Sequence, residues 1–317
     1  MDVLYDLRDR LPATTAVVTT IGVFDGVHLG HQEVLRRVRS EAARLDVESA
    51  VVTFDDHPAR IVRPESAPLL LTTLEQKLDL MAEQGIDHVY VVSFDEGRAA
   101  TPPEVFVDEV FVNALHARAV IVGEDFHFGA GRAGDVEGLR SIGQRRGFGV
   151  IALELVRHAA TASAPVSSTE IRRALAAGEV GRAAEMLGRP FEMRGVVESG
   201  DQRGRQIGFP TANLPMPTSM ARPADGVYAG RVRRIDGSVF GCAINIGRRP
   251  TFYDGVEQSL LEAHLIDFDG DLYGEQLGVS FLGRLRGERK FDGIGALVEQ
   301  LRDDVNAARA LVAGSTW

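Results

Sequence analysis

The sequence predicts an α/β protein of two domains, the first built on a parallel sheet and the second on an antiparallel β-barrel. The chain has 317 residues, 44% of them hydrophobic and 25% charged, and this length is too great for one ordinary hydrophobic core. Short β-branched segments alternate with helical patterns in the first half, whereas hairpin patterns dominate the second half. We therefore expect one domain at 1–187 and another at 188–317.

Five segments of the first half have the composition of strands. They are 16–21, 49–54, 88–94, 119–123 and 150–155. Between them, apolar residues recur at helical spacing, as in the sets Leu35, Val38, Ala42, Leu45 and Leu74, Leu78, Met81. This alternation predicts a parallel, doubly wound sheet covered by helices.

The first domain is expected to end with helical patterns at 168–177 and in a short segment that ends near Leu187. Segments 227–234 and 239–246 then alternate around Asp236-Gly237, which predicts a hairpin with a type I′ turn. A second Asp-Gly pair, Asp269-Gly270, follows a strand pattern at 260–266. These patterns predict an antiparallel β-barrel.

The chain closes with an amphipathic helical pattern that we expect to cover the barrel. Its apolar positions are Leu297, Leu301, Val305 and Ala308.

The formal net charge of −10 argues against a protein whose main task is to coat nucleic acid or an anionic membrane. The N-terminus lacks the basic and apolar regions of a signal peptide, and no run reaches the 18 or so apolar residues of a membrane span. The only cysteine, Cys242, lies in an apolar strand pattern and is expected to be a core thiol. We expect a cytoplasmic protein with small-molecule partners, and a homo-oligomer stays open.

The chain contains only two lysines, Lys77 and Lys290, and neither follows a glycine. A Walker-type phosphate loop requires Gly-Lys-Ser/Thr, so this class of kinase is excluded.

A strand, a glycine-punctuated turn and the start of a helix follow one another at residues 17–32. Gly22, Gly26 and Gly30 allow positive φ or close approach, in a geometry that aims backbone N–H groups at an anion. His28 and His31 are three residues apart at the helix entry, so both rings can donate hydrogen bonds to one anion. By itself the pattern also fits a tight turn whose histidines cap a helix.

The run at 22–31 reads Gly-x-Phe-Asp-Gly-Val-His-x-Gly-His. It resembles the signature of the His-x-Gly-His nucleotidyltransferase superfamily, whose fold is Rossmann-like, in the form typical of prokaryotic FAD synthetases. Three later runs resemble the same family: 53–58 (Thr-Phe-Asp-Asp-His-Pro), 123–129 (Gly-Glu-Asp-Phe-His-Phe-Gly) and 167–172 (Ser-Ser-Thr-Glu-Ile-Arg).

The resemblance implies a catalytic role for His28 and His31. It implies ATP contacts for Gly22, Phe24, Asp25, Gly30, Ser168, Thr169 and Arg172, and a flavin-side loop that contains Asp125, His57 and Pro58. Many relatives have proline at the position of Asp56 and asparagine at that of Asp125, so the detailed roles of these two carboxylates stay open.

A Gly-x-Gly-x-x-Gly run at 129–134 imitates a dinucleotide-binding fingerprint. That fingerprint requires its glycines immediately after a strand, whereas the expected strand ends near Gly123. We assign the run to a substrate-side loop.

A second candidate site is the run 204–214, Gly-Arg-Gln-Ile-Gly-Phe-Pro-Thr-Ala-Asn-Leu. In an extended segment Thr211 and Asn213 lie on the same side, and hydroxyl and amide oxygens are hard ligands suited to Mg²⁺. Taken alone, Thr-x-Asn fits an ordinary turn equally well. Further along, Glu262 and His264 share one face of the strand pattern at 260–266.

This run resembles the Pro-Thr-Ala-Asn signature of the riboflavin kinase family. Companion motifs follow in order at 225–228, 245–252, 261–265, 272–274 and 284–291. The resemblance implies that Glu262 is the general base toward the riboflavin 5′-hydroxyl and that Thr211 and Asn213 hold Mg²⁺. It further implies that Gly204, Arg205, Gly208 and Pro210 bind ATP, while His264 is expected to be a solvent-facing strand residue.

Together the two resemblances imply a bifunctional enzyme of the prokaryotic riboflavin kinase/FMN adenylyltransferase family. It would convert ATP and riboflavin to FMN and ADP, and then ATP and FMN to FAD and diphosphate, with Mg²⁺ as cofactor. Two alternatives stay open: a His-x-Gly-His transferase acting on another nucleotide acceptor, and a flavin-binding regulatory protein without catalysis. Relative rates, flavin redox preference and feedback inhibition are not encoded in these motifs.

Overall fold

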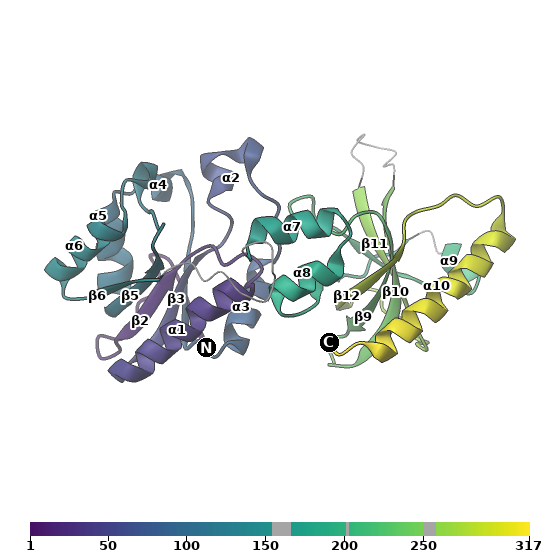
Figure 1. The fold of residues 1–317 in the computed structure, drawn as a ribbon, viewed down its shortest axis with the longest axis horizontal. Helices are drawn as coiled ribbons and strands as arrows, with labels where there is room; N and C mark the ends of the chain where they lie inside the picture. Colours follow the sequence, from purple (N-terminus) through teal and green to yellow (C-terminus); the bar gives the residue numbers. More distant parts are fainter. Residues whose placement is uncertain (154–165, 201–202, 250–257) are drawn as a thin grey trace. The chain divides into compact units, whose positions relative to one another are not determined.

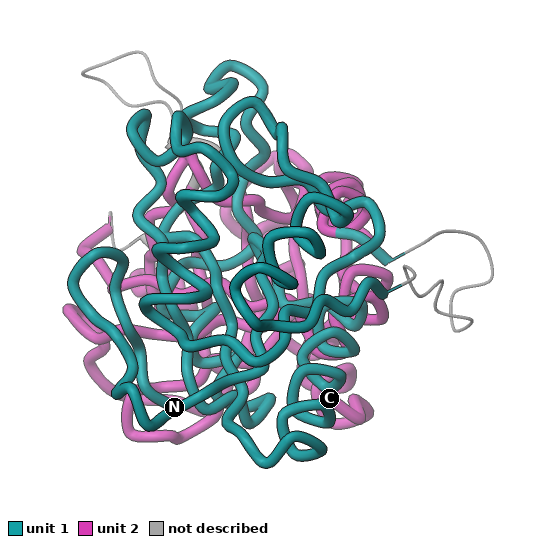
Figure 2. The backbone as a smooth tube through the Cα atoms, turned by 90° about the vertical axis from the view of Figure 1, so that its left-hand side faces the viewer, with its two compact units in different colours: residues 1–167 teal, residues 168–317 magenta. Residues whose placement is uncertain are grey.

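The computed structural model describes residues 1–153, 166–200, 203–249 and 258–317. The chain divides into two compact units, 1–167 and 168–317 (Figure 2). The segment 168–187 thus belongs to the second unit. The expected end of the first domain at residue 187 remains a prediction.

The first unit contains a six-stranded sheet in which every pair of neighbours is parallel. Its strands are β1 (Asp2–Tyr5), β2 (Val17–Ile21), β3 (Glu48–Phe54), β4 (His88–Val92), β5 (Ala117–Gly123) and β6 (Gly149–Leu153). The expected parallel sheet is confirmed, and residues 154–155 of the last expected strand lie outside the described residues. The strand β1 was not expected, because its four residues are too few to show a clear alternation of apolar and polar positions.

Helices cover both faces of this sheet (Figure 1). They are α1 (Leu29–Leu45), α2 (Ala59–Val62), the 3₁₀ turn η1 (Pro64–Ser66), α3 (Leu74–Glu83), α4 (Glu96–Ala99), α5 (Pro103–Phe106), the π-helical η2 (Val107–Ala114), the 3₁₀ turn η3 (Ala130–Arg132) and α6 (Val136–Arg146). Neighbouring strand residues point to opposite faces: Val51 packs with Leu35 and Met81 of α1 and α3, whereas Val52 packs with residues of η2 and α6. The strands are therefore buried on both sides, as expected for a parallel sheet.

The strand order β1-β4-β3-β2-β5-β6 defines where this unit can bind a ligand. The chain runs from β2 through β3 to β4 on one side and then returns to place β5 on the other side of β2. Ligands of open α/β sheets bind at the carboxyl ends of the strands where the order reverses. The turn that follows β2 lies at this point.

The second unit contains six strands in the order β7-β12-β9-β10-β11-β8, all antiparallel. They are β7 (Phe191–Val196), β8 (Ala212–Pro215), β9 (Gly226–Arg233), β10 (Val239–Arg249), β11 (Gln258–Leu265) and β12 (Gln276–Arg286). Just beyond β7, Glu198 forms a bridge with Asn213 of β8, so the two edges of the sheet meet. The expected β-barrel is confirmed in this nearly closed form.

The helices of this unit are α7 (Ser168–Ala176), α8 (Val180–Leu187), α9 (Arg203–Gln206) and α10 (Ile294–Gly314). As expected, the terminal helix α10 covers the barrel, where Ala308 is buried against Ala229 and Ile266. Cys242 is a buried core thiol, as expected, and burial raises its pKa. In the described part of the chain no helix is long and apolar enough to cross a bilayer.

The turn between β9 and β10 differs from the expected type I′ turn. The Gly237 N–H donates to the Arg234 carbonyl at 3.0 Å, but neither central residue of that turn, Ile235 or Asp236, has positive φ. Only Gly237 is left-handed, with φ 84°. The expectation of type I′ was wrong. The two strands are joined by three residues, the last of which is the left-handed glycine, and this type of connection also favours an Asp-Gly pair.

Candidate active sites

The turn after β2 has an unusual backbone. Phe24, Gly26 and Val27 have φ of 51°, 83° and 39°. Glycine accepts this left-handed region freely, whereas each of the other two residues stores about 1–3 kcal/mol of strain. Such a turn persists only if its surroundings hold it, and no sequence pattern indicated the strain at Phe24 and Val27.

The segment after η1 provides part of this support. Oδ1 of Asp25 accepts hydrogen bonds from the Leu71 and Thr72 N–H groups at 2.8 and 3.2 Å, and the Gly26 N–H donates to Thr72 Oγ1 at 3.2 Å. Asp25 is only 3% exposed. The carboxylate therefore fixes the turn, and its expected contact with ATP remains a prediction.

His28 forms the N-cap of α1. Its Nδ1 accepts the His31 N–H at 3.3 Å, so in the neutral ring the proton lies on Nε2. The rings of His28 and His31 stack with centroids 3.6 Å apart and an interplanar angle of 16°. A Cβ on Gly30 would lie 3.2 Å from the His28 ring, which explains the glycine between the two histidines. The structure thus brings the expected pair together at a helix start.

His31 is held in its neutral form. Burial lowers its pKa well below the usual range, and the positive charges of His28 and Lys77 lower it further. Its Nδ1 is buried and has no hydrogen-bond partner within the described residues. The Phe24 ring packs edge-on against it, with centroids 5.1 Å apart. A neutral imidazole with an unpaired nitrogen suits a group that contacts an incoming anion.

Three other expected residues follow the neighbouring strands. His57 comes after β3 and accepts the Ala59 N–H at 3.1 Å, and Pro58 directly precedes α2. Asp125 is exposed in the loop after β5, where its carbonyl lies 2.8 Å from His127 Nδ1. Because β3 and β5 flank β2 in the sheet, these residues lie at the same edge as the histidine pair.

Ser168, Thr169 and Arg172 lie in the first turns of α7, in the second compact unit. Their expected contact with ATP phosphates remains a prediction.

The glycine run 129–134 forms a closed loop. Phe128 and Gly134 exchange two backbone hydrogen bonds of 3.0 and 2.9 Å around η3. No strand precedes the first glycine directly, since β5 ends at Gly123. A dinucleotide fingerprint is therefore absent from this described loop.

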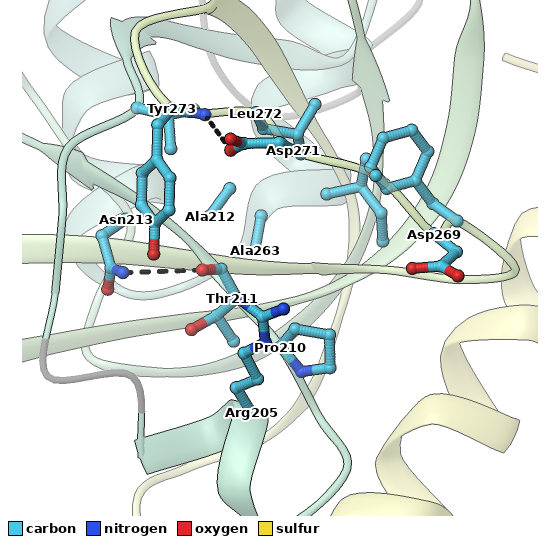
Figure 3. Close-up of a pocket in the computed structure, with 14 residues that line it drawn as sticks. Arg205, Pro210, Thr211, Ala212, Asn213, Ala263, Asp269, Asp271, Leu272 and Tyr273 are labelled. Carbon is cyan, nitrogen blue, oxygen red and sulfur yellow. Dashed lines mark hydrogen bonds between the residues drawn. The ribbon is translucent and has the colours of Figure 1, made fainter.

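A cleft in the second unit contains most of the second set of expected residues (Figure 3). Its lining includes Arg205, Pro210, Thr211 and Asn213. The loop after β11 adds three polar residues, Asp269, Asp271 and Tyr273. Of these, only Tyr273 lies in a motif that the sequence resemblance marked, and none was expected to line the site. Figure 3 shows the Tyr273 side chain pointing toward the segment of Thr211 and Asn213. Asp269 and Gly270, which the sequence pattern indicates only as a turn, also line this cleft.

Strand pairing brings Asn213 and Glu262 together. They are directly opposite in the register of β8 and β11, so their side chains leave the same face of the sheet. Asn245 of β10 faces Glu262 from the other side and donates Nδ2–H to Glu262 Oε2 at 3.1 Å. The Asn213 Oδ1 atom is buried without a hydrogen-bond partner within the described residues. An unpaired amide oxygen beside a carboxylate suits a hard cation.

The loop before β8 is braced from within the unit. His264 Nδ1 lies 2.8 Å from the Pro210 carbonyl and its ring packs edge-on to Phe209. The side chain, expected to face solvent, is therefore only partly exposed and supports the loop. A Cβ on Gly204 would lie 2.3 Å from the Phe209 carbonyl oxygen, so this position requires glycine. Gly208 has φ of 88°. Of the motif at 245–252, residues 250–252 lie outside the described residues.

These two units define a class of protein: a nucleotide-dependent transferase with a His-x-Gly-His helix start on a parallel sheet and a separate amide–carboxylate site on a β-barrel. The family model of FAD synthetase matches residues 11–170, and that of riboflavin kinase matches residues 187–312. The chain belongs to the bifunctional riboflavin kinase/FMN adenylyltransferase family.

Curated relatives match over the full length. The chain is 40% identical to the bifunctional riboflavin kinase/FMN adenylyltransferase of Pseudomonas fluorescens, over 99% of both proteins. It is 39% identical to that of Haemophilus influenzae, over 98% of this chain and 99% of the relative. Among solved structures, a Streptococcus pneumoniae protein described as a macrolide-efflux protein superposes with a TM-score of 0.86 at 30% identity, covering 98% of this chain and 99% of that one.

Proposed function

We propose that this chain converts riboflavin to FAD in two ATP-dependent steps, with FMN as the intermediate product. The supporting observation is that both family models match one chain, each mainly over one of its compact units. The product of the second unit is then the substrate of the first. The presence of both enzyme families in one chain gives no support to the alternative, a transferase that acts on another nucleotide acceptor.

In the kinase step, the riboflavin 5′-hydroxyl oxygen attacks the γ-phosphorus of ATP, a new P–O bond forms, and ADP leaves. Glu262 accepts the hydroxyl proton. Its place on a rigid strand and its hydrogen bond from Asn245 orient the carboxylate for this role.

Thr211 and Asn213 are proposed to hold Mg²⁺ together with ATP phosphate oxygens. The unpaired Oδ1 of Asn213 supports this assignment. Two protein oxygens would leave Mg²⁺ to take its remaining ligands from nucleotide and water. When bound, Mg²⁺ would stabilise negative charge on the transferring phosphates.

In the adenylylation step, an FMN phosphate oxygen attacks the α-phosphorus of ATP and diphosphate leaves. The attacking group is already anionic, so the chain has no need to supply a base. His28, His31 and the amide groups at the start of α1 would stabilise charge on the phosphates. Ser168, Thr169 and Arg172 would add a second set of donors, as the family resemblance implies.

The test is incubation of the purified chain with ATP, Mg²⁺ and riboflavin, followed by chromatographic separation of flavins. We expect FMN first and FAD later, and no FAD when Mg²⁺ is chelated. Retention of riboflavin without turnover would instead identify a flavin-binding regulatory protein. The cytoplasm remains the expected location.

A further inference from the structure

Lys77 is buried at the turn that carries the first site, although its charge would ordinarily place it on the surface. It lies on α3 and is only 5% exposed. Its ammonium donates to three oxygens: the Val23 carbonyl at 3.1 Å, the Phe54 carbonyl at 2.9 Å and Thr53 Oγ1 at 3.2 Å. All three ammonium protons therefore have an acceptor.

The three acceptors belong to the ends of two neighbouring parallel strands. Thr53 and Phe54 are the last residues of β3, and Val23 begins the strained turn after β2. Thr53 also donates from Oγ1 to the Val23 carbonyl at 3.2 Å. Lys77 thus connects the turn of the histidine pair to the end of the adjacent strand.

The residue type fits this geometry. Only two of the 35 lysines and arginines in the chain are lysines, so the chain uses arginine almost everywhere else for positive charge. A compact ammonium donates hydrogen bonds in three directions. A planar guanidinium instead presents a rigid fork of donors, which suits the paired oxygens of a carboxylate or phosphate. Burial lowers the pKa of Lys77 to about 8, while the carboxylates of Asp25, Asp55 and Asp56 favour the charged form.

We propose that Lys77 is a positioning residue for adenylylation, which fixes the Val23–Gly26 segment so that the start of α1 and the His28–His31 pair are preset for the ATP phosphates. The inference rests on the proposed adenylylation reaction. Lys77 acts on the backbone of the turn and touches no reacting atom. Its loss should reduce turnover more than ATP affinity, because charge stabilisation in the transition state depends most on exact placement of donors.

The test is Lys77→Met in the full-length protein, which keeps the length and apolar stem and removes the donors. With FMN and Mg·ATP added, we expect kcat for FAD formation to fall at least tenfold while the KM for ATP changes less than threefold. FMN formation from riboflavin should stay within twofold of the wild-type rate. Wild-type kcat for FAD in this variant would overturn the proposal.

A matched control is Tyr90→Phe in the same sheet. It removes the hydrogen bond from the Tyr90 hydroxyl to Asp6 Oδ1, 2.9 Å long and buried, without touching the turn. We expect a lower melting temperature and FAD synthesis within twofold of wild type. An equal loss of FAD synthesis in both variants would reduce Lys77 to a general stabilising role and overturn the proposal.

Thr53→Val tests the same contact from the acceptor side and decides the matter if Lys77→Met does not fold. We expect at least a threefold lower kcat for FAD in Thr53→Val alone. Where Lys77→Met folds, combining the two substitutions should cause no further loss. An unchanged kcat in Thr53→Val, or fully additive losses, would contradict the proposal. A wild-type protein that forms no FAD would count against the proposed function instead.

Discussion

Glu262 is the residue whose proposed role in phosphoryl transfer is easiest to isolate. Glu262→Gln keeps the size of the side chain and an acceptor for Asn245 but removes the proton acceptor. We expect riboflavin phosphorylation to fall by about 10²-fold or more, the usual scale for a lost general base. The measurement is initial FMN formation at saturating ATP, with FAD synthesis from added FMN as the internal control. Unchanged FMN formation would remove Glu262 from the mechanism.

Lys77 predicts a pH dependence of stability. Burial lowers its pKa from 10.5 to about 8 in the folded protein, so between these values the unfolded chain binds more protons than the folded one. Stability therefore rises with pH across this window, by up to about 3 kcal/mol from this group. Lys77→Met should lack this rise. Urea denaturation of both proteins at pH 7.5 and pH 10 measures the difference, and parallel changes in the two proteins would show that Lys77 does not cause it.

At the scale of elements, α7 and α8 pack as part of the barrel unit. Val180, Met186 and Leu187 of α8 are buried, the Ala224 N–H donates to the Leu175 carbonyl at 2.9 Å, and Arg284 of β12 donates to the Ala177 carbonyl at 3.4 Å. These helices are therefore joined to the barrel by apolar contacts, by a backbone hydrogen bond to the segment before β9 and by the Arg284 side chain of β12.

We accordingly expect a fragment 188–317 to be less stable than a fragment 168–317 by about 3 kcal/mol or more, because it exposes the apolar surface that α8 covers. Urea denaturation of the two fragments followed by circular dichroism gives the comparison. Equal midpoints and slopes would mean that α7 and α8 contribute nothing to the fold of the barrel unit.

At the scale of the whole molecule, the two proposed phosphate-handling sites, which lie on separate sheets, predict separable activities. His31→Ala should remove a donor to the ATP phosphates in adenylylation, a loss of roughly 3 kcal/mol if it resembles loss of an oxyanion donor. FMN should then accumulate from riboflavin without FAD. Asn213→Ala should do the reverse, slowing FMN formation while FAD still forms from added FMN. Loss of both reactions in folded His31→Ala protein would indicate one shared ATP site.

The sequence by itself determined what is local along the chain. The parallel sheet and the barrel followed from the spacing of apolar residues, because that spacing decides which elements can bury a face. The histidine pair was also readable, since residues three apart at a helix start share a face whatever surrounds them, and the structure places His28 and His31 in contact.

Only the tertiary structure decided what depends on the register and packing of distant segments. The pairing of Asn213 with Glu262 requires β8 and β11 to align in one register, and a shift by one residue would turn either side chain to the other face. The burial of Lys77 depends on the carbonyls of two strand ends that meet only in the folded sheet. Its sequence context is an amphipathic helix, in which a lysine is expected at the surface, and the free energy that places it inside comes from acceptors that no local pattern encodes.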